Sequence, residues 1–202
     1  QPLGTHIGNA LEVKDAIDVL AGRTQGDLLE ISLLLGSHML VLAEKARTLP
    51  EARAMLENAL SSGAGLRKLA EMIAAQGGDP RVVEDLSLLP QAAVKRVMRA
   101  ETAGYLSAMD TTALGMAAQR MGAGRAKKSD MLDYSVGYVL HVRLGDEVME
   151  DTPLATLYAR NEAEAEEAEK AIRKALTIAG EKPSVPPLWD AVVTAEGITY
   201  NR

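Results

Sequence analysis

The chain has 202 residues, a formal net charge of −6 and no cysteine, and 47% of its residues are hydrophobic. That apolar content supports a folded core and excludes a largely disordered chain. The lack of cysteine excludes disulfides, thiolate metal sites and cysteine catalysis. No block of Lys and Arg indicates a nucleic-acid partner, and no apolar run approaches the roughly 18–20 residues that cross a bilayer. With no secretory leader pattern, we expect a cytoplasmic protein with neither a membrane nor a nucleic acid as partner.

The first part of the chain has the apolar spacing of α-helices. Asn9 and Glu12 fit a capping box, in which side chains satisfy free backbone N–H groups at the start of a helix. Residues 26–46 are apolar on nearly every side, which predicts a helix buried over most of its surface. We therefore expect a helical part over residues 1–90.

The character of the sequence changes after residue 90, where strand-like alternation of apolar and polar residues begins. We expect a small α+β domain over residues 91–193 and a tail over 194–202. Within that domain the pattern predicts helices at 110–121 and 161–179, and strands at 93–99, 104–109, 134–142, 154–159 and 191–193.

Residues 142–154 resemble the turn-and-strand pattern of biotinyl and lipoyl carrier domains, with a turn at Gly145-Asp146 followed by Val148. A carrier also needs a Lys on a hairpin just after that strand. Residues 160–165 contain no Lys and begin a helix instead. We therefore expect a carrier-like (barrel-sandwich/hammerhead) architecture without carrier chemistry, and no biotin or lipoate.

Several other candidate sites fail on their spacing. The glycines and lysines of residues 122–129 lack the Gly that a phosphate loop places before Lys-Ser, and they follow a helix rather than a strand. His6, His38 and His141 have no mutual spacing typical of zinc ligands. No Gly-x-Ser-x-Gly motif marks a nucleophilic serine. These patterns favour structural roles.

The opening segment, residues 1–15, is the strongest candidate site. It is a glycine-punctuated loop that leads into a helix, and such a loop normally follows a strand, which we expect to lie outside this chain. Leu3 and His6 can turn backbone carbonyls towards one point while Asp15 presents a carboxylate, and hard cations favour such oxygen ligands. Three ligands are too few for a closed site, so a tight turn beside an exposed Asp remains the alternative.

Several segments follow one another in the order of a known enzyme family: Gln1–Lys14, Leu35–Ala46, Ala75–Asp79, Gly122–Lys128, Val136–His141, Gly145-Asp146 and Pro153–Thr156. In these segments the chain resembles the pyrimidine-nucleoside phosphorylases and thymidine phosphorylases. The agreement of several motifs in unbroken order makes the match far more specific than any one glycine pattern. The resemblance runs from residue 1 to about residue 193, and it leaves residues 194–202 unexplained.

This resemblance implies an enzyme of nucleoside salvage, a glycosyltransferase that converts a pyrimidine (deoxy)nucleoside and phosphate into the free base and (deoxy)ribose 1-phosphate. It also implies a homodimer in which a helical domain and an α/β domain flank a cleft. The family's phosphate loop, Lys-His-Ser-Thr-Gly-Gly, does not occur in this sequence. We therefore expect the C-terminal half of the enzyme, an α+β fragment of an α/β enzyme that is inactive alone and has no catalytic or substrate-binding residue.

One site of the family carries over in part. Members that resemble this chain bind a cation, usually potassium, through two backbone carbonyls and a carboxylate, and those positions match Leu3, His6 and Asp15. His6 replaces an Ala, which changes little for a carbonyl ligand. Asp15 replaces a Glu, which shortens the carboxylate arm by one methylene. The alternative function is a stand-alone binding or scaffold module that uses the carrier-like β domain to bind partners.

Overall fold

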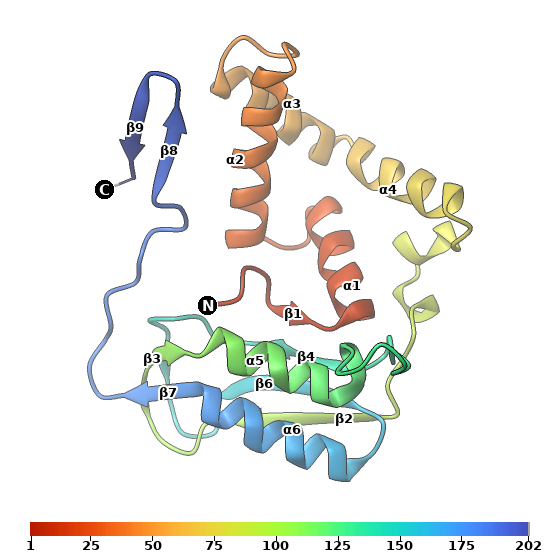
Figure 1. Ribbon diagram of the computed structural model, residues 1–202, viewed down its shortest axis with the longest axis vertical. Coiled ribbons are helices and arrows are strands. Elements are labelled where there is room, and N and C mark those ends of the chain that lie inside the picture. Colours follow the sequence, from red (N-terminus) through yellow and green to blue (C-terminus); the bar gives the residue numbers. More distant parts are fainter. Residues whose placement is uncertain (202) are drawn as a thin grey trace.

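The computed structural model describes residues 1–201 of the chain. The first part is helical, and helices occur where the apolar spacing predicts them. In Figure 1 these helices lie above the sheet region, coloured red to yellow. The elements are α1 (Asn9–Leu20), α2 (Asp27–Leu42), α3 (Leu49–Ser61) and α4 (Ala64–Ala75), followed by the short 3₁₀ helices η1 (Pro80–Val83) and η2 (Leu86–Leu88).

The strands form separate antiparallel sheets, with orders β1-β4-β6-β2, β5-β3-β7 and β8-β9. The mixed α+β composition is thus confirmed, whereas the carrier-like description and the domain boundaries stay predictions. The strands are β1 (His6–Ile7), β2 (Val94–Arg99), β3 (Gly104–Met109), β4 (Gly137–Leu140), β5 (Glu147–Val148), β6 (Pro153–Ala159), β7 (Leu176–Ala179), β8 (Ala191–Thr194) and β9 (Gly197–Tyr200).

The main core lies between the four-stranded sheet and a layer of helices. That layer consists of α5 (Thr111–Ala118), the π-helical turn η3 (Gln119–Ala123) and α6 (Glu162–Ala175), which Figure 1 shows across one side of the sheet. Tyr138 of β4 is fully buried there, and its hydroxyl donates to the Leu114 carbonyl at 2.8 Å. This core supports the sheet with which the first segment of the chain pairs.

Two glycines allow β1 to approach β4 closely. Gly8 and Gly137 both have positive φ, of 130° and 150°, a region that side chains other than glycine rarely adopt. A Cβ added to Gly137 would lie 2.1 Å from the Ile7 carbonyl oxygen, and one added to Gly8 would lie 2.5 Å from that of Val136. The first segment of the chain is therefore paired with the sheet, although it directly precedes the helices in the sequence.

Residues 176–179 form β7, so the prediction of a helix to residue 179 is wrong. α6 ends at Ala175, and Leu176 is extended with φ −109° and ψ 134°. Ile178 then pairs with Leu106 of β3. Pairing with β3 decides the structure here, because β-branched residues suit a strand and the tertiary contact outweighs local helix propensity.

The predicted cap at Asn9 is also wrong. The N-cap of α1 is Gly8, whose backbone N–H donates to Glu12 Oε1 at 3.3 Å. Asn9 lies inside the helix and donates from Nδ2 to the Ala123 carbonyl at 2.9 Å. The Asn9 side chain thus bonds to a residue distant in the sequence instead of capping the helix.

α2 is far more exposed than its sequence predicts. Leu35, Met39 and Leu42 are 57%, 68% and 83% exposed, because α3 packs on only one side of the helix, around Leu29 and Leu33. Within residues 1–201, no helix is both long and apolar enough to cross a membrane.

Replacing Gly137 with Ala should strongly destabilise the chain. The new Cβ would collide with the β1 backbone at a φ that costs about 1–3 kcal/mol for other residues, so β1 would leave the sheet. Urea unfolding measures the loss. Gly180→Ala is the matched control, because a Cβ there meets no atom within 4 Å. Equal stabilities of the two variants would contradict the proposed close approach.

Candidate functional site

The predicted residues Leu3 and Asp15 lie in the wall of one cavity, of about 310 Å³, between the first loop and the start of α2. Residues 24–28 and Arg143 also line that wall. His6 lies outside it, in β1, where it pairs with Val139 of β4. The structure therefore brings two of the three predicted residues to one cavity.

His6 and Asp15 face each other through their side chains. His6 Nδ1 lies 3.4 Å from Asp15 Oδ1 and 3.0 Å from Thr5 Oγ1. Both side chains are well buried, at 11% and 7% exposed. A Cβ on Gly4 would lie 2.7 Å from the second Asp15 oxygen, Oδ2, so the loop backbone also packs closely against this carboxylate. The imidazole, which the sequence analysis treated as incidental, is thus a neighbour of the carboxylate.

Burial lowers the pKa of His6 below its ordinary value. The negative charge of Asp15 raises that pKa and offsets only part of the burial effect. Desolvation disfavours the charged form of an imidazole, so the neutral ring is favoured in this pair near neutral pH. The pair therefore behaves as a buried polar contact.

Arg143, which follows β4, reaches the first loop from the sheet region. Its Nη1 donates to the carbonyls of Pro2 at 2.8 Å and Gly4 at 3.4 Å, and its Nη2 donates to that of Leu3 at 3.3 Å. Nη2 also donates to Asp27 Oδ2 at 2.6 Å. One guanidinium thus connects the loop, the start of α2 and the end of a sheet strand.

These contacts bear on the predicted cation set of Leu3, His6 and Asp15, which stays a prediction. The Leu3 carbonyl accepts from Arg143, and Asp15 faces the His6 ring. Within residues 1–201, no three His, Cys, Asp or Glu side chains are grouped so that they could hold a metal ion. The donors present do not fit a potassium ion well, because a fixed positive charge already lies among the carbonyls.

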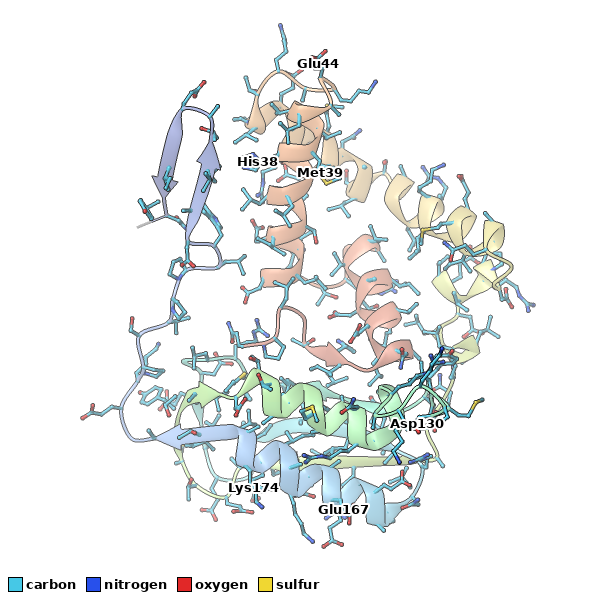
Figure 2. The ribbon with its side chains drawn as sticks, in the orientation of Figure 1. His38, Met39, Glu44, Asp130, Glu167 and Lys174 are labelled. Carbon is cyan, nitrogen blue, oxygen red and sulfur yellow. The ribbon has the colours of Figure 1, made fainter. Side chains whose placement is uncertain are left out.

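The other histidines do not join this cluster. His141 Nε2 contacts Thr156 Oγ1 at 2.7 Å, and Figure 2 shows His38 on α2, in a different part of the molecule from Asp130.

Asp130 Oδ2 accepts from the backbone N–H groups of Ala126 and Lys127. Local hydrogen bonds of this kind stabilise a turn, which agrees with the structural reading of residues 122–129.

Sequence reasoning missed Arg143 and Asp27. Arg143 is separated from its carbonyl partners by 139–141 residues, and no spacing rule connects positions so far apart. The available signal was weak: an Arg two residues before Gly145 of the predicted turn.

The segment from β3 to β7 matches a known protein family. Residues 105–179 match the family model described as the pyrimidine nucleoside phosphorylase C-terminal domain. A protein named pyrimidine-nucleoside phosphorylase from Bacillus subtilis (strain 168) is 50% identical over 162 residues, which cover 80% of this chain and 37% of that relative. One from Staphylococcus aureus (strain USA300) is 42% identical over 194 residues, which cover 96% of this chain and 44% of the relative.

These matches define an enzyme family and agree with the resemblance seen in the sequence. Residues 105–179 match the C-terminal domain of pyrimidine nucleoside phosphorylases, and the chain is similar over most of its length to proteins of that name. The chain spans less than half the length of these curated relatives.

The lowered pKa of His6 predicts a pH dependence of stability. The unfolded chain, with a His pKa of about 6.5, binds more protons than the folded chain as the pH falls through that value. Stability is therefore full above about pH 6.5 and is lost as the pH falls towards the lower folded-state pKa. His6→Gln should flatten this part of the curve, as measured by urea unfolding at a series of pH values.

His141 needs a separate variant, because burial lowers its pKa as well. The double variant His6→Gln/His141→Gln should show a weaker pH dependence than either single variant. A wild-type slope in His6→Gln would contradict the assignment to His6.

Proposed function

We propose that this chain is the C-terminal part of a pyrimidine-nucleoside phosphorylase that cleaves pyrimidine (deoxy)nucleosides with phosphate to the base and (deoxy)ribose 1-phosphate. The observation that carries the proposal is the 42% identity to the Staphylococcus aureus relative over 96% of the chain. Identity at that level over nearly the whole chain argues for the relatives' reaction, with phosphate as the co-substrate.

The catalytic and substrate-binding groups belong, in this proposal, to the part of the relatives that the chain does not span. Two observations support that placement. The chain covers only 37–44% of the relatives. The charged groups at its candidate site are also already engaged, since Arg143 is bonded to Asp27 and to three carbonyls. A phosphate needs donors that are free to bind it.

The proposal extends to the parent enzyme as a cytoplasmic homodimer of nucleoside salvage. The exposed apolar residues of α2 support contact with further protein, because large exposed apolar patches mark interaction surfaces. The carrier-like description of residues 91–193 is kept as well, supported by the turn at Gly145, with φ 89°, that leads from β4 towards β5. Neither biotin nor lipoate enters the proposal.

The isolated 202-residue chain should not cleave uridine or thymidine in the presence of phosphate. Release of free base, followed by absorbance or chromatography, is the measurement, with the Bacillus subtilis relative as positive control. Turnover at ordinary enzyme rates, about 1–10³ s⁻¹, would overturn the placement of the catalytic groups outside this chain.

A different measurement separates the enzyme from the alternative of a stand-alone binding module. The intact mass of the native protein should be about twice the 21.5 kDa of this chain, because the chain spans 44% of a relative. A native species near 21.5 kDa that binds protein partners and shows no phosphorolysis would favour the binding module.

A further inference from the structure

Three consecutive backbone carbonyls converge on one side chain. The carbonyls of Pro2, Leu3 and Gly4 lie 2.8, 3.3 and 3.4 Å from the guanidinium nitrogens of Arg143. Converging carbonyls are a usual way for a protein backbone to surround a cation. Here the position at their focus is filled by a cation that belongs to the chain itself.

The charge of this cation is permanent and partly shielded from water. An arginine remains protonated in proteins at all ordinary pH values. The Arg143 side chain is 24% exposed, and its counter-charge, Asp27, is 37% exposed at an Nη2 to Oδ2 distance of 2.6 Å. Gln1 contributes to the cluster from the loop, since its Nε2 donates to Asp27 Oδ2 at 3.4 Å.

The backbone that carries Arg143 is held by hydrogen bonds within the sheet region and by one to the loop. The N–H of Arg143 donates to Asp146 Oδ2 at 2.7 Å, and the N–H of Gly145 donates to the Leu106 carbonyl at 2.8 Å. The Leu144 N–H donates to Gln1 Oε1 at 2.9 Å. The turn thus presents the guanidinium to the first loop from a fixed base in the sheet region.

We propose that Arg143 is the resident cation of the first loop, where it binds the Leu3 carbonyl, one of the groups for which the family resemblance implies a potassium ion. Its guanidinium orients the carbonyls of residues 2–4 and neutralises Asp27, so this segment keeps its shape without a metal ion. A second cation at the Leu3 carbonyl would be repelled by the guanidinium, which already binds that oxygen. Of the predicted set of Leu3, His6 and Asp15, the Leu3 carbonyl is thus bound by a side chain that sequence spacing could not connect to it.

Arg143 is in this view a positioning residue, and its proposed role does not depend on phosphorolysis. The test therefore uses the 202-residue chain itself and no nucleoside. The readout is hydrogen exchange at the amides of residues 3–8, followed by mass spectrometry in choline chloride, potassium chloride or methylguanidinium chloride at equal ionic strength.

Arg143→Ala should speed exchange at residues 3–8 by about tenfold in choline chloride, which reports local opening of the loop. Potassium or methylguanidinium should reverse most of that increase, because either cation can occupy the vacated position among the carbonyls. The wild-type chain should exchange at the same rate in all three salts. Arg143→Lys, which keeps the charge but loses the planar fork, should give an intermediate rate without a response to potassium.

Arg53→Ala is the matched control. Arg53 also makes several charged hydrogen bonds, to Glu30 and Glu57, but it lies on α3 among the helices. Its removal should leave the exchange of residues 3–8 and their salt response unchanged.

Three outcomes would overturn the proposal. One is unchanged exchange in Arg143→Ala. Another is faster exchange that no cation reverses, which would mean that the side chain acts by packing alone. The third is slower exchange of the wild-type chain in potassium than in choline, which would show that a metal ion binds beside the guanidinium. The third measurement and the Arg143→Lys variant remain decisive if Arg143→Ala does not fold.

Discussion

The close approach of β1 to β4 is the constraint on which the rest of the structure depends. It needs glycine on both sides, because a Cβ at Gly137 or Gly8 would lie 2.1 or 2.5 Å from the opposite backbone. Through this contact the first loop is held over the sheet, and α1 starts from a fixed point immediately after it. The loop residues of the candidate site take their position relative to the sheet from that pairing.

The guanidinium of Arg143 holds the part of the first loop that lies outside the glycine-dependent pairing of β1 with β4. Strand pairing covers the two residues of β1, and the Leu140 N–H donates to the Thr5 carbonyl just before them. The carbonyls of residues 2–4 lie before this paired segment. Arg143 supplies donors to three of those carbonyls and joins them to Asp27 at the start of α2. Buried or half-buried carbonyls left without donors are costly. The same side chain therefore stabilises the loop and ties the helices to the sheet.

Local patterns in the sequence predicted the helices and strands more accurately than they predicted the contacts between them. The side chains of Thr48 and Asn161 cap α3 and α6, and such caps can be read from the sequence because they need only neighbouring residues. The strand at residues 176–179 and the role of Asn9 were missed, because each depends on a partner about 70 or more residues away. Arg143 was missed for the same reason. The candidate site is therefore the least predictable part of the chain, since it is built almost wholly from long-range contacts.

His6, which stands where the family resemblance implies an Ala, has a consequence of its own in this arrangement. A ring at this position faces Asp15 at 3.4 Å and takes part of the carboxylate's bonding capacity, while Arg143 takes that of the Leu3 carbonyl. Two side chains from different elements thus satisfy, separately, two groups that the family resemblance assigns to one ion. Protein contacts hold both groups of a site divided in this way, which supports the proposed role of Arg143 in positioning the first loop.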